Sequence, residues 1–310
     1  MRFFITSNIK NNPALRILIL AILTGCLLYW IGNWFFYHSK FGLSYNKMFL
    51  YFFSDPSFPE PLPISQLFED IHISMFMVIV LCTLLSSLFL QSQKNKFQQT
   101  VLILTLFGTG ITEVLLSLVI YFISPVFIYA KIFAFLFFQI TFLLIFIITL
   151  RFYLLGKGET YTEKSLLYTV VLLFSTSAVL FTFLSFFLFI SKVGITPQSI
   201  SEYYLGNPTK FMKPKSLSTL LESTVPHLLV MSVFIFTLIH FILFTTFKGK
   251  LLSGILLFSC AFFESTSGLF IRLGVEPFSY IKLISFIGFC VGVLFLSFKV
   301  IISVGSSIKS

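Results

Sequence analysis

Four charged residues lie in stretches of the sequence that are otherwise almost entirely apolar. Glu113 precedes Lys131 by the same interval as Glu264 precedes Lys282. A lone charge inside a membrane costs several kcal/mol, and an opposite charge nearby is the usual remedy. We therefore expect two ion pairs, Glu113 with Lys131 and Glu264 with Lys282. Each pair could clamp a helical hairpin structurally, or act as a proton or ion relay or as a substrate anchor.

The histidines indicate a different chemistry, the ligation of haem iron. His227 and His240 lie on one predicted helix, about 20 Å apart at roughly 1.5 Å per residue. This spacing suits two stacked haems, each of which needs a second ligand from a facing helix. His72 opens the second span of the first half, two residues out of strict register with His227, so one b-type haem between these two histidines is a hypothesis; no histidine mirrors His240. The alternative is that the histidines form hydrogen bonds at the membrane interface.

Acidic residues near the same histidines raise the alternative of a metal site. Glu69 and Asp70 precede His72, and Glu222 precedes His227. Carboxylate and imidazole ligands suit zinc or iron, but their spacing matches no defined metal motif. The sequence also carries no hydrolase, metalloprotease or nucleotide-binding motif, so catalysis is not predicted.

The composition places these residues in a membrane protein. The chain of 310 residues is 57% hydrophobic and 10% charged, with a mean hydropathy of +1.00, whereas soluble domains carry roughly 25% charged residues. A spanning helix needs about 20 apolar residues. Suitable runs lie near 15–37, 71–91, 99–122, 126–150, 166–191, 227–247, 251–271 and 278–303. The predicted fold is therefore all-α, with eight transmembrane helices.

The cysteines all lie inside these apolar runs and form no CxxC pair. We interpret them as small buried side chains. Cys26 ends the tetrapeptide LTGC, which is similar to a lipoprotein cleavage box. Because the apolar run continues beyond Cys26, the segment is better interpreted as the first span.

The excess of basic residues, 21 against 11 acidic, follows the predicted topology. With eight spans both termini share one side, which holds twelve Lys and Arg and two acidic residues, against nine and seven on the other side. The positive-inside rule then places both termini in the cytoplasm. We expect a bacterial inner-membrane protein that contacts the lipid bilayer and is open to association with other membrane-protein subunits. No nucleic acid is expected, because no stretch interleaves basic and aromatic residues.

The second half of the chain repeats the first. LFGTGITE, ending in Glu113, returns as LFSCAFFE, ending in Glu264, and FIYAK at 127–131 returns as FSYIK at 278–282, both with an offset of 151. We interpret this as a tandem duplication with copies at 1–155 and 156–310. Because each copy has four spans, both copies point the same way, and a pseudo-two-fold axis along the membrane normal should relate them.

Two long segments on the outer side, 39–70 and 192–226, hold most of the prolines and tyrosines. Within the second, TPQSISEYY predicts a short helix with Thr196 as N-cap and Pro197 at its first position. These segments could form a lid over an outer site or simply an amphipathic connector with an aromatic belt. Gly288 and Gly292 have the GxxxG spacing of closely packed helices.

The outer segments also carry a family resemblance. FGLSYNKMFLYFFSDPSFPEPLPISQLFEDIH and VGITPQSISEYYLGNPTKFMKPKSLSTLLESTVPH resemble segments of small bacterial four-span membrane proteins of unknown function. The shared pattern is Gly-Leu-Thr, paired aromatics, a Ser-x-Leu-Leu-Glu run and one or two histidines opening a span. Here Val225 stands where a paired histidine would be expected, and the first copy has only His72. The resemblance implies two such proteins fused in one chain, and it implies no activity.

Three functions remain open from the sequence. The leading hypothesis is a non-enzymatic membrane component of a redox or respiratory system, carrying one b-type haem between His72 and His227. The second is a transporter or channel that uses the two Glu–Lys pairs. The third is a structural or assembly subunit of a membrane complex.

Overall fold

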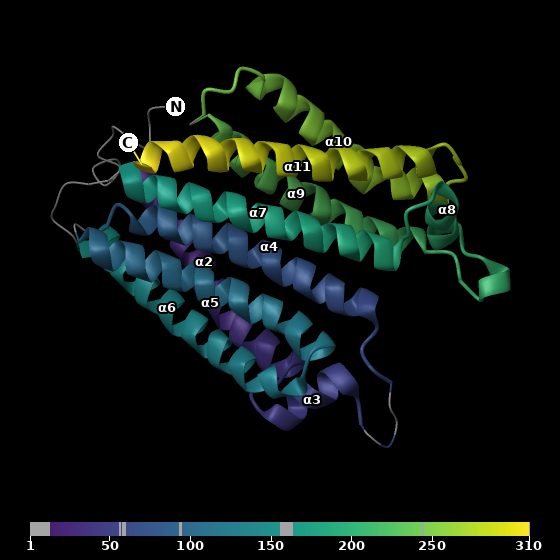
Figure 1. The fold of residues 1–310 in the computed structure, drawn as a ribbon, viewed down its shortest axis with the longest axis horizontal. Helices are drawn as coiled ribbons and strands as arrows, with labels where there is room; N and C mark the ends of the chain where they lie inside the picture. Colours follow the sequence, from purple (N-terminus) through teal and green to yellow (C-terminus); the bar gives the residue numbers. More distant parts are fainter. Residues whose placement is uncertain are drawn as a thin grey trace. The chain divides into compact units, whose positions relative to one another are not determined.

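The computed structural model describes residues 13–309 except 56, 58–59, 93–94, 156–163 and 244. Its helices confirm the predicted all-α membrane fold, because eight of them are long and apolar enough to cross a bilayer (Figure 1). These spans are Leu15–Lys40, Ile64–Phe89, Lys96–Phe122, Pro125–Leu154, Ser165–Lys192, Leu217–Ile242, Lys250–Arg272 and Phe278–Val304.

The chain packs as two compact units, Met1–Phe174 (unit 1) and Ser175–Ser310 (unit 2). The helices of unit 1 are α2 (Pro13–Lys40), α3 (Tyr45–Phe53), α4 (Ile64–Phe89), α5 (Lys96–Phe122), η2 (Pro125–Phe127) and α6 (Ile128–Leu155). Helix α5 packs between α4 and α6, while α2 and the short α3 pack against α6.

Unit 2 repeats this arrangement. Its helices are α8 (Pro197–Leu205), η3 (Pro208–Lys210), α9 (Leu217–Ile242), α10 (Lys250–Arg272) and α11 (Phe278–Lys309), together with the later part of α7 (Lys164–Lys192). Helix α10 packs against α9 and α11, and α8 rests on α10 and α11. The boundary between the units falls inside α7, and the division of the sequence into copies at 155/156 stays a prediction.

The bounds of corresponding helices reproduce the sequence offset. Helix α8 begins and ends at the same offset of 152 from α3, and the corresponding offset for α4 and α9 is 153 at both ends. Because the first and the last residue of each helix keep the same offset, the sequence repeat is also a repeat of local structure. The chain therefore contains one helical domain twice.

A glycine in the left-handed region turns the chain at the same place in both units. Gly42 has φ 71° and Gly194 has φ 85°. The Gly42 N–H donates to the Tyr37 carbonyl at 3.1 Å, and the Gly194 N–H donates to the Phe189 carbonyl at 3.0 Å. Such a bond closes the C-terminus of a helix and satisfies a carbonyl that would otherwise lack a partner. The corner directs the chain into α3 or α8.

The short helix predicted from TPQSISEYY is confirmed as α8. Thr196 is its N-cap and forms a capping box with Ser199, and Pro197 occupies the first turn. Ile200 and Tyr204 are the buried side chains of this helix. It is therefore an amphipathic helix that rests on the spans through one face.

The first and last spans of each unit meet through a stacked pair of aromatic rings. Tyr37 stacks on Phe135 with ring centroids 3.6 Å apart, and Phe189 stacks on Phe286 at 3.9 Å. Both members of the second pair follow their counterparts by the repeat offset. The same packing contact thus joins α2 to α6 and α7 to α11.

The GxxxG spacing on α11 marks close packing against α10. A Cβ atom added at Gly288 would lie 2.9 Å from Cys260 Sγ, and one added at Gly292 would lie 2.9 Å from Leu257 Cδ1. Neither distance leaves room for a side chain. Small residues therefore let these two spans approach each other, as in other membrane helix pairs.

The predicted starts of the second and sixth spans are wrong. The sequence placed them at 71 and 227, but α4 begins at Ile64 and α9 at Leu217. Hydropathy misses the polar first turns, and Pro226 lies inside α9 rather than before it. His72 and His227 consequently lie about 12 and 15 Å into their helices, at roughly 1.5 Å per residue, rather than at the span ends.

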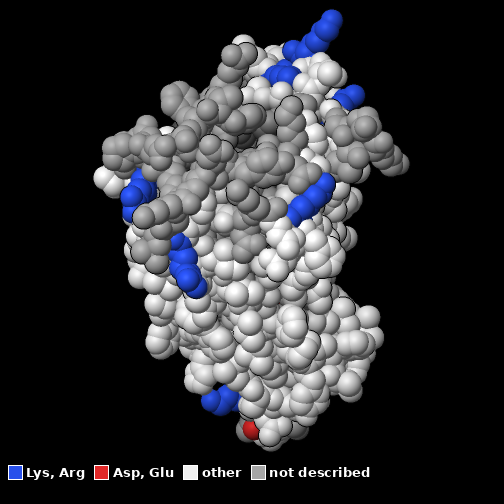
Figure 2. Space-filling model, turned by 90° about the vertical axis from the view of Figure 1, so that its left-hand side faces the viewer, with Lys and Arg blue, Asp and Glu red and all other residues white. Residues whose placement is uncertain are grey.

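The two ends of the spans differ in charge within each unit. One end of the spans lies near the chain termini and near the connections between α4 and α5, α6 and α7, and α9 and α10. The basic residues there whose side chains the structure describes are Arg16, Lys96, Arg151, Lys248, Lys250 and Lys299. Outside the two predicted pairs, the acidic residues that the structure describes lie at the opposite ends: Asp55, Glu60, Glu69, Asp70, Glu202, Glu222 and Glu276. Figure 2, viewed from the left of Figure 1, accordingly shows blue Lys and Arg side chains and hardly any red.

The glycine corner gives the first prediction. Gly194→Ala should destabilise the protein by about 1 kcal/mol or more, because left-handed backbone costs an L-residue about that much and the new Cβ would lie 2.3 Å from Ser199 Oγ. The matched control is Gly25→Ala in α2, whose Cβ meets nothing within 4 Å and which should be neutral or stabilising. Thermal unfolding in mild detergent measures both. Equal effects of the two changes would contradict the assigned role of the corner.

Candidate functional site

The first predicted pair lies in the hairpin of α5 and α6. The 3-10 turn η2 joins the two helices, with Ser124 as its N-cap and Pro125 in its first turn. The Ser124 side chain accepts a hydrogen bond from the Val126 N–H at 3.3 Å. A turn this short makes the helices antiparallel neighbours, so residues on either side of it face each other. This local geometry brings Glu113 on α5 to Lys131 on α6.

Lys131 closes the first clamp, defined as Glu113 with Lys131. Its Nζ binds the Glu113 carboxylate and also donates to the Glu113 main-chain carbonyl at 2.8 Å. The Lys131 side chain is 2% exposed and that of Glu113 is 13% exposed. The amine is therefore enclosed by protein, and the carbonyl supplies a second acceptor for it.

The second clamp, Glu264 with Lys282, has the same construction in the hairpin of α10 and α11. Lys282 Nζ lies 2.9 Å from Glu264 Oε1 and donates to the Glu264 carbonyl at 2.7 Å. The side chains are 6% and 16% exposed respectively. The structure thus brings together all four charged residues of the predicted pairs, and each clamp lies within a single hairpin.

At least one aromatic ring lies close to each ammonium group. Lys131 Nζ lies 5.9 Å from the ring centroid of Tyr37 and 5.1 Å from that of Phe41, and Lys282 Nζ lies 5.7 Å from that of Tyr204. A ring face attracts a cation, the more so when water is excluded. Tyr204 belongs to α8, outside the spans, and burial raises the pKa of its phenol. The short outer helix therefore helps to enclose the second clamp.

The second clamp has an additional member that the sequence did not predict. His227 Nε2 on α9 lies 3.6 Å from Glu264 Oε2, and its side chain is 37% exposed. The helix offset of 153 places Ser74 of α4 at the corresponding position of unit 1. The two clamps therefore share their core and differ at this neighbouring residue. The sequence could not predict the contact between His227 and Glu264, because it depends on how α9 packs against the hairpin of α10 and α11.

A groove of about 320 Å³ lies beside His227, between α9 and α10. Its lining residues are Leu228, Met231, Ser232, Phe258, Ser259, Ala261, Phe262 and Phe263. Leu228 and Met231 follow His227 within about one turn of α9, so the groove continues along the same side of this helix. Most of the lining is apolar, as expected for a surface at membrane depth.

The end of the third span anchors the outer segment in each unit. Tyr121 Oη donates to the Leu62 carbonyl at 2.9 Å, and Arg272 Nε donates to the Lys215 carbonyl at 2.6 Å. Tyr121 and Arg272 are repeat equivalents, as are Leu62 and Lys215. Different side chains thus make the same connection, which holds each outer segment over its hairpin.

The predicted metal ligands are not assembled. In the part of the chain that the structure describes, neither unit gathers three or more His, Cys, Asp or Glu side chains into a group that could hold a metal ion. Asp70 is instead bound by Lys40, by the Tyr51 hydroxyl and by Gln66 Nε2, the last at 3.1 Å. This network raises the pKa of the Tyr51 phenol, through burial and the nearby carboxylate. The expectation of a site at Glu69, Asp70 and Glu222 is therefore not supported.

The haem hypothesis stays a prediction. His72 lies on α4 of unit 1, whereas His227 and His240 lie on α9 of unit 2. His227 faces Glu264, and the His240 ring lies 6.4 Å from Phe236 and 6.0 Å from Phe241. Within unit 2, His227 therefore lies next to a carboxylate, and His240 lies next to aromatic rings.

Several buried polar residues were not predicted from the sequence, Gln139 among them. Gln139 on α6 is 1% exposed, and neither polar atom of its side-chain amide has a hydrogen-bond partner among the described residues. Its main-chain carbonyl accepts a bond from Trp30 Nε1 at 3.1 Å. A single amide in an apolar run gives no signal without a partner at fixed spacing, which explains the omission.

Comparison with known proteins supports the repeat. The model of a family described as a transmembrane helical domain matches residues 42–161 and again residues 194–308. The starts of the two matches differ by an offset of 152, close to the offset found within the sequence itself. No curated protein and no solved structure matches the chain.

The haem hypothesis has a direct test. Protein purified from membranes of haem-replete cells should show a Soret band that shifts on reduction if His72 and His227 ligate haem, and the band should be lost in His227→Ala. His38→Ala serves as the control, since His38 lies at the exposed end of α2. A spectrum without a Soret band would refute haem binding, and elemental analysis of the same sample tests for zinc and iron.

Proposed function

Because the chain belongs to the Aq_1264_TM family of transmembrane helical domains, we propose that it is a non-enzymatic structural or assembly subunit of a membrane complex. In this function each unit is a stiff four-span scaffold held by its clamp. The resemblance to small four-span proteins, fused here in tandem, fits the same role. We prefer this function to that of a redox component, because none of the histidine contacts described above favours a cofactor.

The proposal rests on one observation: in both clamps the lysine is bound by its glutamate and enclosed by protein. Each amine is bound by a carboxylate and a carbonyl of the same helix, and its side chain is 2% or 6% exposed. A relay or substrate anchor must exchange its partners during function, whereas a clamp keeps them. Two copies with the same enclosed contacts favour the clamp, since removing one partner leaves an uncompensated charge in the bilayer.

We further propose that both termini face the cytoplasm and that the membrane is a bacterial inner membrane. The support is the distribution of basic residues at one end of the spans in each unit. The short helices α3 and α8 then lie on the outer side, close to the headgroups. The copies, taken as 1–155 and 156–310, would have the same orientation in the membrane.

A double-mutant cycle tests the structural role. Glu113→Gln or Lys131→Met alone should lower the free energy of unfolding by about 3 kcal/mol, because each leaves a buried charge unpaired. The combined variant should be less destabilised than either single change. Denaturant unfolding in mild detergent measures the cycle, and Glu264→Gln with Lys282→Met repeats it in unit 2. Single variants that fold as stably as the wild type would overturn the clamp.

The pair Glu202 and Lys210 provides the control for this cycle. Lys210 Nζ lies 2.6 Å from Glu202 Oε2 outside the spans, and the Lys210 side chain is 60% exposed. Water can solvate the Lys210 ammonium there, so removing one partner should change stability little. A loss as large as that at the clamps would show that the effect does not come from the membrane environment.

One observation favours transport as a second candidate function. His227 is partly exposed, contacts Glu264 and adjoins the groove between α9 and α10. This arrangement could pass a proton from the surroundings to the second clamp. The first clamp has Ser74 at the corresponding position and lacks this route.

Flux measurements separate the two functions. The scaffold proposal predicts that proteoliposomes containing the purified protein take up protons no faster than empty vesicles under an imposed potential. A pH-sensitive dye inside the vesicles reports the rate. Uptake above the empty-vesicle rate that is abolished in His227→Gln would favour the transporter and contradict the scaffold.

A further inference from the structure

The outer segment of unit 2 forms a rigid projecting loop, residues 206–215, which we term the basic loop. Asn207 and Met212 exchange main-chain hydrogen bonds of 2.9 and 3.0 Å, and they enclose the short turn η3. Gly206 permits this fold, because a Cβ there would lie 2.6 Å from the Met212 carbonyl. Figure 1 shows the loop at the right-hand end of the molecule, next to α8.

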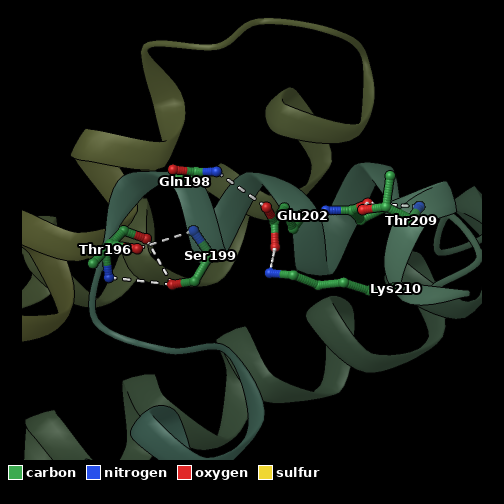
Figure 3. Close-up of polar contacts among 7 residues, drawn as sticks. Thr196, Gln198, Ser199, Glu202, Thr209 and Lys210 are labelled. Carbon is green, nitrogen blue, oxygen red and sulfur yellow. Dashed lines mark hydrogen bonds and ion pairs between the residues drawn. The ribbon is translucent and has the colours of Figure 1, made fainter.

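Polar contacts attach the basic loop to α8 (Figure 3). Lys210 binds Glu202 at 2.6 Å, and Glu202 also accepts a bond from Gln198 at 3.2 Å. These hydrogen bonds lower the pKa of the Glu202 carboxyl, so the pair is retained as pH falls until that group protonates. At the base of the loop, the Lys215 N–H donates to the Tyr204 carbonyl at 3.1 Å. The loop is therefore attached to α8 at its middle and at its end.

This fixed loop presents a strained and exposed aromatic residue. Phe211 is 95% exposed and has φ 55°, in the left-handed region. A bulky residue there is a backbone outlier that costs about 1–2 kcal/mol relative to glycine. Neither burial nor backbone preference within this unit explains a phenylalanine at the tip. Strain of this kind is often associated with a functional site.

The charge of the outer segment has opposite sign in the two units. Between Glu202 and Glu222 the chain carries Lys210, Lys213 and Lys215 and no acidic residue. The corresponding segment of unit 1, residues 51–68, has Asp55 and Glu60 and no Lys or Arg. Duplicates of one domain have thus acquired complementary outer surfaces.

Unit 1 also carries a row of aromatic rings beside its acidic segment. Tyr45 lies between Tyr129 and Phe49, with ring-centroid distances of 5.2 and 6.0 Å, and Phe49 lies 5.1 Å from Phe53. Helix α3, which carries three of these rings, ends next to Asp55. We term the rings with Asp55 and Glu60 the acidic–aromatic face. It offers ring contacts for a phenylalanine and carboxylates for lysines.

Both surfaces lie on the same side of the membrane. Four candidate spans separate segment 41–63 from segment 193–216, and an even number of crossings returns the chain to its starting side. The two surfaces can therefore meet when copies of the protein lie side by side. A pair of reciprocal contacts about a two-fold axis closes a dimer.

We propose that the basic loop of one copy docks on the acidic–aromatic face of a second copy of this chain. Phe211 is the central contact, stacking against the rings of α3, and Lys213 approaches Asp55 and Glu60. Aromatic residues at the centre and charges at the rim are the usual division at protein interfaces. This inference goes beyond the scaffold proposal and does not depend on the clamps.

Cysteine crosslinking tests the contact directly. Thr209→Cys and Ser57→Cys place thiols on the two surfaces, and both residues are exposed. Differently tagged single variants, co-expressed and treated in native membranes with a short thiol crosslinker, should give a mixed dimer. Either variant expressed alone should not, and the wild type reports any background from the four native cysteines. A crosslink that forms only within one chain carrying both changes would overturn the proposal in favour of an intramolecular contact.

Three substitutions distinguish docking from a local structural role. Phe211→Asn removes the ring and relieves the backbone, so it should lower crosslinking about tenfold without lowering thermal stability. Lys213→Glu should also reduce the dimer, and Lys213→Glu combined with Glu60→Lys should restore it by exchanging the charges. A dimer insensitive to Phe211→Asn, or a charge exchange that fails to rescue, would refute the assigned interface. Failure here leaves the double-mutant cycle of the clamps unaffected, so the two proposals are separable.

Discussion

A bilayer core offers no water to solvate a charge, and this constraint governs the interior of both units. The amines of Lys131 and Lys282 are accommodated there because a carboxylate, a main-chain carbonyl and aromatic rings replace the water. The carboxylate and the carbonyl come from the helix that faces the lysine across the hairpin, and the rings come from α2, from Phe41 and from α8, so satisfying one amine positions several elements at once. A four-span unit with few polar contacts thereby obtains a defined packing.

Much of this arrangement was predictable because its signals are local or periodic. Apolar runs identified the spans, and the repeated Glu–Lys spacing identified both ion pairs, since a tight turn fixes which residues of a hairpin meet. The starts of α4 and α9 were misplaced because hydropathy does not detect amphipathic first turns, and because Pro226 is accommodated within a helix. The contact between His227 and Glu264 was not predictable, as it depends on how α9 packs against α10. The expected metal cluster is not assembled among the described residues for a related reason: Asp70 is bound by a lysine and a tyrosine from other elements.

The differences between the units are as informative as their likeness. The spans, corners and clamps are retained, whereas the residues next to the second clamp and the charges of the outer segments have diverged. Packing in a membrane tolerates little change, because a displaced charge or an added Cβ has no space to occupy. Surfaces outside the spans face water, where exchanging an acid for a lysine costs little. Divergence has accordingly accumulated at positions that can acquire partners without weakening the scaffold.

Helix α7 has a consequence for how the protein is divided. It is one continuous helix, Lys164–Lys192, yet the boundary between the compact units falls at Phe174 within it. Residues 164–174 therefore belong to unit 1, although the predicted sequence repeat would place them in the second copy. A cut between the two compact units would break the candidate span Ser165–Lys192. A cut at 155/156 would instead part residues 164–174 from the unit to which they belong, so neither cut releases both compact units intact.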